Sequence, residues 1–146
     1  RRKIMTKKIL CAVDDTEYSK ASVAVAAQLA KAMDAELTFL AINQLMGGYG
    51  RGGASTYLWD SAAVERVLDG ATTAAKKEGV KAFKTANMKS RDVGRAIVIF
   101  AEENDIDHIV VGTGGKGGVS RLMLGSVSSD VLARAHCPVT VARLHK

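Results

Sequence analysis

The sequence predicts a single doubly wound α/β domain, in which helices cover both faces of a parallel β-sheet. Short apolar runs of strand length alternate along the chain with longer segments whose apolar residues recur at helical spacing. Strands that alternate with helices are joined by right-handed crossovers, which make the sheet parallel and cover it on both sides. A length of 146 residues suits one domain, and neither an internal repeat nor an interdomain linker is visible.

Five segments are predicted as strands: residues 9–13, 37–42, 80–86, 108–111 and 139–142. The first is a continuous apolar run of five residues, which is typical of a strand buried on both faces. Residues 80–86 are polar at alternate positions, which places that strand nearer an edge of the sheet.

Four segments are predicted as helices. The first follows Asp15 or Thr16, either of which can cap it, and its expected apolar stripe is Ala21, Val25, Leu29 and Ala32 or Met33. The second covers residues 58–77, with Val64, Val67, Leu68, Ala71 and Ala75 on its apolar face, and Gly79 is a natural stop signal after it. The third covers residues 93–103, with Ile97, Phe100 and Ala101 inward, and the last begins at Ser126 and continues over residues 127–135.

The net charge of +6 does not by itself indicate a nucleic-acid partner. Arg1, Arg2 and Lys3 supply three of these charges, so the rest of the chain carries 6 − 3 = +3. The remaining basic residues are scattered and are not interleaved with aromatic side chains, so we expect no specific nucleic-acid binding. No apolar run is long enough for membrane insertion. Residues 5–146 form the expected domain, and residues 1–4 are either a non-native addition or a short basic extension.

Cys11 and Cys137 are too few and too far apart for a disulfide framework or a metal site. Both are expected to be packed thiols in a reducing compartment, which indicates a cytoplasmic protein. The three histidines show no metal-ligand spacing, so no protein-bound metal is expected.

Two glycine-rich stretches compete as a phosphate-binding loop. Residues 48–53, Gly-Tyr-Gly-Arg-Gly-Gly, match the spacing of a dinucleotide-binding fingerprint. Such a fingerprint follows the first strand and leads directly into a helix, whereas this one follows the second strand and no helix begins at once. We therefore interpret it as a flexible surface loop.

The second stretch, residues 112–126, lies between the fourth strand and the last helix. Its glycines let backbone N–H groups form a concave nest, and the helix that begins at Ser126 offers unpaired N–H groups and a favourable dipole to an anion. Lys116 and Arg121 can add positive charge. It is not a Walker A loop, because Gly118 and Val119, not Lys and Ser or Thr, follow Gly117.

In this stretch Gly112, Gly115 and the pair Gly125-Ser126 form the pattern G-x2-G-x9-G-[S/T], which resembles the motif of the ATP-binding universal stress proteins. Residues 9–14, 107–112 and 137–139 also resemble that family, so the likeness covers nearly the whole chain. The resemblance implies a Rossmann-like sheet of five parallel strands in the order 3-2-1-4-5.

The resemblance also implies the residues of a nucleotide site. Asp14 and the backbone of Ile42 match positions that meet adenosine, and Gly112, Gly115, Gly125, Ser126, Val127 and Ser128 match positions that contact phosphate. The implied ligand is ATP, ADP or AMP, with Mg²⁺ held mainly by phosphates and water because no carboxylate cluster is evident.

The predicted function is that of a cytoplasmic ATP-binding stress-response protein that acts as a regulatory nucleotide-binding module. One alternative is a slow ATPase or another nucleotide-using enzyme of the same architecture, and at most weak ATP hydrolysis or autophosphorylation is expected. A nucleotide-free interaction module is a further alternative, against which the intact glycine motif argues. The last strand is short, apolar and last in the expected strand order, so we expect it to lie at an edge of the sheet. The resemblance implies a homodimer that pairs at this edge through Val139, Thr140, Val141, Ala142 and Arg143.

Overall fold

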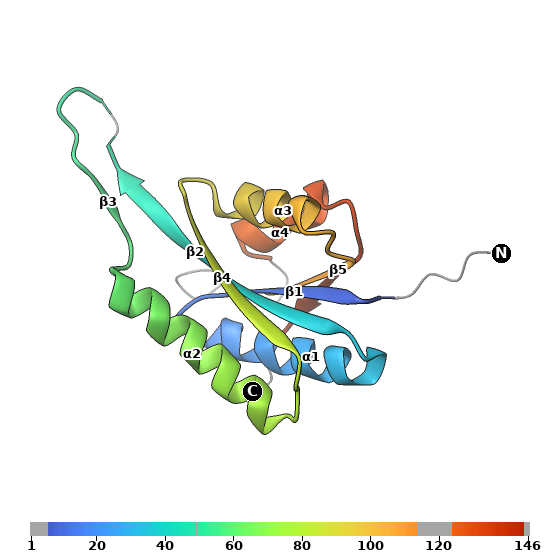
Figure 1. Ribbon diagram of the computed structural model, residues 1–146. Helices are drawn as coiled ribbons and strands as arrows, with labels where there is room; N and C mark the ends of the chain where they lie inside the picture. The colour runs from blue at the N-terminus through green and yellow to red at the C-terminus, as the bar shows by residue number, and fades with distance from the viewer. Residues whose placement is uncertain (1–5, 49, 114–123, 145–146) are drawn as a thin grey trace.

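A computed structural model describes residues 6–48, 50–113 and 124–144 of the chain. The elements follow in the order β1 (Lys8–Val13), α1 (Glu17–Met33), β2 (Glu36–Gly47), β3 (Ser55–Tyr57), α2 (Ser61–Lys77), β4 (Phe83–Ser90), α3 (Val93–Glu103), β5 (His108–Gly112), α4 (Ser126–Arg134) and β6 (Val139–Ala142). Helices lie on both sides of the sheet, α1 and α2 on one face and α3 and α4 on the other (Figure 1).

The predicted parallel sheet is confirmed. Five strands pair in parallel in the order β4-β2-β1-β5-β6, which is the expected order 3-2-1-4-5 once the strands are counted without β3. β1 and β5, which lie at the centre, contain Ile9, Leu10, Cys11, Ile109 and Val110, all fully buried. β4 pairs with β2 alone among these strands, so the alternating polarity of that segment did indicate an edge.

One part of the sheet differs from the prediction. The second strand does not end at residue 42 but continues to Gly47, and the short β3 pairs with its end in antiparallel register, Leu45 opposite Tyr57. The end of β2 and β3 therefore form the two strands of a projecting hairpin, and the described residues of the stretch 48–53, predicted as a flexible surface loop, lie at its tip (Figure 1). The neighbouring strand β4 is shifted in the same direction. It lies at 83–90 rather than 80–86, and it pairs with the extended part of β2 as far as Gln44 with Ser90.

The apolar stripe predicted for α1 is wrong. The buried residues of this helix are Ser19, Ser22, Val23, Ala26, Ala27 and Ala30, whereas Met33 is exposed and Val25 and Leu29 are half-buried. α1 packs against the sheet and also against α2, so small side chains occupy its closest contacts. The buried face of α2 is the predicted one, because Val64, Leu68, Ala71 and Ala75 are buried. This helix begins at Ser61 rather than residue 58, since the Asp60 side chain accepts a hydrogen bond from the Ala63 N–H at 2.8 Å and caps it.

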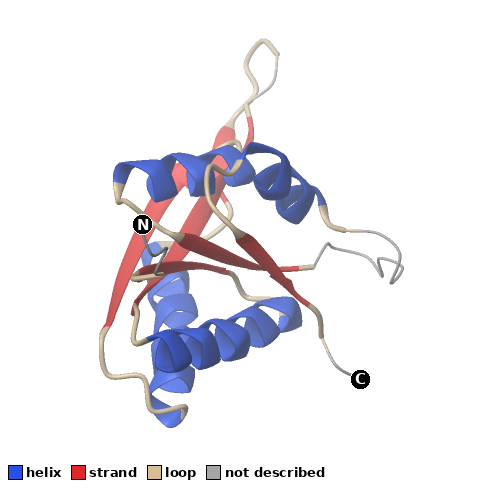
Figure 2. Ribbon diagram, turned by 90° about the vertical axis from the view of Figure 1, so that its right-hand side faces the viewer, coloured by secondary structure: helices blue, strands red, loops and turns tan. Residues whose placement is uncertain are grey.

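Two apolar clusters fill the space between the sheet and its helices. The first contains Phe39 and Leu37 beneath α1 and α2, and the second contains Leu40, Ile97 and Val131 beneath α3 and α4. The view in Figure 2 shows the helices above and below the strands. In the part of the chain that the structure describes, no helix is long and apolar enough to cross a membrane.

Candidate functional site

A cavity of about 1090 Å³ opens at the carboxyl ends of the central strands. Its walls come from the ends of β1, β2 and β5, from the first turns of α1, α3 and α4, and from the segment between β3 and α2. Five predicted site residues line it together: Asp14, Ile42, Gly112, Ser126 and Val127. In a parallel sheet of this order, the point between β1 and β5 is where the direction of winding reverses and where ligands bind.

Asp14 directly follows β1 and is exposed at the cavity. Its Oδ1 atom accepts hydrogen bonds from the N–H of Thr16, at 2.8 Å, and from the Thr16 hydroxyl. The Asp14 N–H in turn donates to the Ser19 hydroxyl at 3.0 Å. No described residue donates to Oδ2, so one oxygen fixes the carboxylate and the other can accept from a ligand hydroxyl or amino group.

Gly112 ends β5 beside the first turn of α1. A Cβ atom at this position would lie 2.8 Å from the carbonyl oxygen of Tyr18. Since this distance is shorter than real Cβ contacts allow, the close packing of α1 on β5 itself requires glycine here. The glycine of the predicted motif thus has a structural role whether or not its backbone meets a phosphate.

The first turn of α4 presents N–H groups that the helix itself leaves without partners. Gly125 is the N-cap residue, with φ −64° and ψ 161°, and no side chain caps the helix. The N–H groups of Ser126, Val127 and Ser128 belong to the first turn and lack partners within the helix. The Gly125 N–H donates to the Thr113 carbonyl at 2.9 Å, so the end of β5 and the start of α4 are held side by side.

Ser128 differs from its two neighbours. Its side chain is buried and its hydroxyl donates to the Gly125 carbonyl at 3.0 Å, away from the cavity lining. Only its backbone N–H remains available in the first turn. Ser129, which the sequence analysis did not single out, lines the cavity. The predicted residues Gly115, Lys116 and Arg121 lie outside the described residues.

The glycines of the competing fingerprint lie at the hairpin between β2 and β3. Gly47, Gly48, Gly50 and Gly52 all have positive φ angles, between 72° and 83°, which glycine adopts without steric cost. The Gly48 N–H donates to the Ala54 carbonyl at 3.0 Å and closes the turn. None of the described residues in 47–53 lines the cavity, so these glycines serve the chain reversal.

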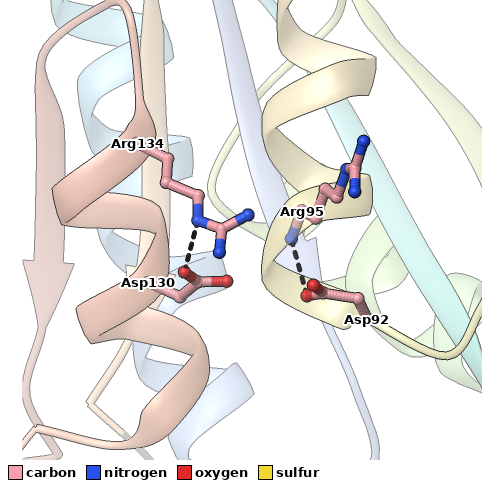
Figure 3. A network of polar contacts seen from close by, with 4 residues as sticks. All are labelled: Asp92, Arg95, Asp130 and Arg134. Atoms are coloured by element: carbon pink, nitrogen blue, oxygen red, sulfur yellow. Dashed lines mark hydrogen bonds and ion pairs between the residues drawn. The ribbon is translucent and has the colours of Figure 1, made fainter.

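The cavity wall formed by α3 and α4 was not predicted from the sequence. Figure 3 shows two polar pairs on the neighbouring helices: the Asp92 carboxylate accepts from the Arg95 N–H at 3.1 Å, and Arg134 Nε lies 2.8 Å from Asp130 Oδ1. Asp92, Gly94 and Asp130 line the cavity. The signal for Asp92 was present, since an Asp before a predicted helix is a common N-cap. No sequence signal linked Gly94 to Asp130.

None of the groups with shifted pKa values lines the cavity. Burial raises the pKa of the Cys11 thiol to about 12, although a hydrogen bond with Ser22 opposes the shift. Burial also lowers the pKa of His108, whose Nε2 lies 2.7 Å from the Thr140 hydroxyl. No described histidine lines the cavity. Among the described residues, no group of three or more His, Cys, Asp or Glu side chains could hold a metal ion.

Comparison with known proteins identifies the family. The profile of the universal stress protein family matches residues 5–143. The chain belongs to the universal stress protein family. Universal stress protein YxiE of Bacillus subtilis is 31% identical over 155 residues, which cover 95% of this chain and all of the relative. Universal stress protein MJ0531 of Methanocaldococcus jannaschii is also 31% identical, and the match covers 96% of this chain and 84% of the relative.

Solved structures of universal stress proteins share the fold. A universal stress protein from Archaeoglobus fulgidus superposes with a TM-score of 0.72 at 26% identity, over 94% of each chain. A universal stress protein from the same organism, in complex with dAMP, gives 0.70 at 25% identity over 95% of this chain and 99% of that one. A universal stress protein in complex with cAMP gives 0.73 at 22% identity over 95% and 98% of the two chains, which shows the fold alone.

Proposed function

We propose that this universal stress protein is a cytoplasmic, ATP-binding module that regulates a stress response through its nucleotide state. The observation that carries the proposal is that expected adenosine and phosphate contacts line one and the same cavity at the carboxyl edge of the sheet. It is lined both by Asp14 and Ile42, the expected adenosine contacts, and by Ser126 and Val127 of an uncapped helix terminus. The cavity thus offers a carboxylate acceptor and N–H donors to one ligand.

At the adenosine end, the chemistry suits a nucleoside. Asp14 Oδ2 can accept hydrogen bonds from ribose hydroxyls, and its position is fixed because Oδ1 is bound by Thr16. The backbone of Ile42 lies in the part of β2 beyond the end of β1, which pairs only as far as Val13 with Ala41. Its peptide groups on the β1 side can therefore face the adenine edge.

At the phosphate end, the donors belong to the first turn of α4. The N–H groups of Ser126, Val127 and Ser128 and the dipole of the helix favour an anion at this position. We propose that Gly112 and Gly125 also contact the phosphates, together with Gly115, Lys116 and Arg121 of the glycine-rich loop. Mg²⁺ would be held by phosphate oxygens and water, in keeping with its preference for few protein ligands.

The nucleotide class is supported by the relative bound to dAMP, whose identity to this chain is 25%. Adenine and a phosphate are common to dAMP, AMP, ADP and ATP, so that relative supports an adenine nucleotide. Our choice of ATP rests on the resemblance of the glycine motif. The cytoplasmic location is proposed from the two cysteines, which are free thiols, with Cys11 fully buried.

We assign the homodimer to the edge strand β6. Among the described strands, β6 pairs with β5 alone, and Val139, Thr140 and Val141 are only half-buried. An open edge exposes N–H and C=O groups that a second copy can pair around a two-fold axis. The contact would include residues 139–143 and would leave the nucleotide cavity outside it.

The direct experiment is to denature the purified protein and identify any small molecule released, then to titrate stripped protein with ATP, ADP, AMP and GTP by calorimetry. We expect one site per chain that prefers adenine nucleotides. Failure of every adenine nucleotide to bind would overturn the proposal. A turnover assay then separates the regulatory module from an ATPase, since rapid hydrolysis would favour the enzyme.

A further inference from the structure

Trp59 is the single tryptophan of the chain and lies between two cavities. It lines the nucleotide cavity and also a second cavity of about 510 Å³ between α1 and α2. Asp14, Thr16 and Ser19 line both cavities as well, so Trp59 shares both with the carboxylate expected to meet adenosine. Its side chain is half-buried and packs against the core cluster beneath α1 and α2.

The buried side chain of Asn43 hydrogen-bonds both the N–H and the carbonyl group of Trp59. Asn43 Nδ2 donates to the Trp59 carbonyl at 2.8 Å, and the Trp59 N–H donates to Asn43 Oδ1 at 2.9 Å. Asn43 is only 4% exposed, so these two bonds satisfy an amide that burial would otherwise make costly.

The position of this pair follows from the hairpin register. Leu45 lies opposite Tyr57, and the Leu58 N–H donates to the Gln44 carbonyl at 2.9 Å. One further step of the antiparallel register brings residue 43 opposite residue 59. There the amide side chain of Asn43, rather than its backbone, makes the pair of bonds.

The chain is fixed on the other side of Trp59 as well. Asp60, the next residue, caps α2 through its hydrogen bond from Ala63, so residue 59 is bound by Asn43 and is followed directly by a helix cap. A backbone fixed at two successive residues loses little further freedom when a ligand binds. The Trp59 backbone is therefore preorganised at the cavity wall, and packing against the core cluster beneath α1 and α2 restrains the indole.

We propose that Trp59 is a binding residue whose indole contacts the base of the bound nucleotide, and that Asn43 is the positioning residue that holds it there. The inference rests on the proposed nucleotide site. Ile42, the expected backbone contact to adenosine, is the neighbour of Asn43, so the same stretch of β2 places both the backbone edge and the aromatic wall. A flat indole surface suits a purine, and aromatic contacts with bases contribute strongly to affinity.

The test uses the full chain, with ATP and inorganic pyrophosphate as probes in calorimetry. Trp59→Ala should weaken ATP binding by about tenfold or more, the loss typical of a base–aromatic contact. Trp59→Phe, the matched control, keeps an aromatic ring and should stay within about threefold of wild type. Pyrophosphate, which has no base, should bind all three proteins alike.

Tryptophan emission gives an independent measurement on the unmodified protein. Because Trp59 is the single tryptophan, its emission should change on ATP addition with the same midpoint as the calorimetric curve. Asn43→Asp keeps the oxygen that accepts from the Trp59 N–H, but it replaces the donor to the Trp59 carbonyl by a second oxygen. This variant should therefore weaken ATP binding and leave pyrophosphate binding unchanged. If Asn43 serves folding alone, this variant would lower stability without changing the ratio of the two affinities.

Two results would overturn the inference in different ways. If wild-type protein binds ATP but its emission does not change and Trp59→Ala binds ATP normally, Trp59 does not meet the base and the nucleotide site stands without it. If wild-type protein binds no nucleotide by calorimetry, the proposed function fails and this inference fails with it.

Discussion

The Gly125 N–H donates a 2.9 Å hydrogen bond to the carbonyl oxygen of Thr113. This bond joins the residue after β5 to the N-cap of α4, across the glycine-rich segment between them. A second bond, from the Thr113 N–H to the Ala142 carbonyl at 3.1 Å, ties the same point to β6. The first-turn N–H groups of α4 are therefore fixed relative to the central strands.

Gly94→Ala should destabilise the protein. A Cβ atom on Gly94 would lie 2.4 Å from Asp130 Oδ2 and 3.0 Å from Asp130 Cβ, so α3 and α4 would have to move apart. Overpacking of this kind costs about 1–3 kcal/mol of the free energy of unfolding. Urea unfolding measures the change, and an Asp130→Ala background, which removes the nearest atoms, should reduce it.

Gly70→Ala is the matched control for this substitution. Gly70 lies within α2, and an added Cβ would meet no atom within 4 Å. The change should raise the free energy of unfolding by about 0.5–1 kcal/mol through helix propensity. Equal effects of Gly94→Ala and Gly70→Ala would show that the contact with Asp130 does not constrain residue 94.

His108 should make the protein less stable as the pH falls. Burial lowers its pKa in the folded state below the usual 6.5, so between these two pKa values the unfolded chain binds more protons. Stability associated with neutral His108 is present above about pH 6.5 and is lost as the pH falls toward the folded pKa. His108→Gln, which can still hydrogen-bond Thr140, should flatten this part of the curve when unfolding midpoints are compared from about pH 7.5 to about pH 5. Parallel curves for the two proteins would contradict the prediction.

The cysteines should resist alkylation in the folded protein. Burial raises the pKa of Cys11 to about 12, and burial together with the charge of Asp107 raises that of Cys137. The reactive thiolate is thus scarce at about pH 8. Mass spectrometry after iodoacetamide treatment should show slow modification, first at the half-buried Cys137, and rapid modification of both thiols in denaturant. Rapid labelling of Cys11 in the native protein would contradict its burial.

Val141→Lys should produce monomers if β6 is the dimer edge. A lysine at this half-buried position would place charge in the strand contact. Thr85→Lys is the matched control, because Thr85 is exposed on β4 at the opposite edge and should leave the dimer intact. Light scattering measures the mass of both variants. A Val141→Lys protein that remains dimeric would place the interface elsewhere.

The sequence predicted the parallel sheet well, because its central strands are short apolar runs between helical segments. The bounds of α3 and β6 agree with the prediction as well. The hairpin of β2 and β3 could not be predicted in the same way. Its pairing depends on residues 45 and 57 meeting across a glycine-rich turn, and neither strand there shows an alternating apolar pattern.

The error in α1 has a different cause. The helix is rich in alanine, so more than one set of positions at helical spacing is apolar, and the sequence does not show which one faces two neighbours. The fold selects Ala26, Ala27 and Ala30 for the closest contacts, and the larger Val25 and Leu29 lie at the margin.

The candidate site was partly visible in the sequence. The motif and the resemblance led to Asp14, Ile42, Gly112, Ser126 and Val127, which do line one cavity. The sequence could not show that Asn43 would hold Trp59 at the same cavity, because that contact joins residues 16 positions apart through a side chain. Nor could it show that Gly112 is required by the Tyr18 carbonyl.

We propose above that backbone N–H groups at the start of α4 bind the phosphates of a nucleotide. Ser126→Pro tests it most directly, because proline is well tolerated at the first position of a helix and removes one of these N–H groups. The extended ψ of 161° at Gly125 also suits a residue before proline. Ser126→Ala is the matched control, since it removes the hydroxyl and keeps the N–H.

The measurement is a calorimetric titration of both variants with ATP and with adenosine. Ser126→Pro should weaken ATP binding by more than about tenfold relative to Ser126→Ala, the loss expected for a hydrogen bond to a charged group. Adenosine, which lacks phosphates, should bind the two variants alike. Equal ATP affinities for two folded variants would contradict the claim that the first turn of α4 holds the phosphates.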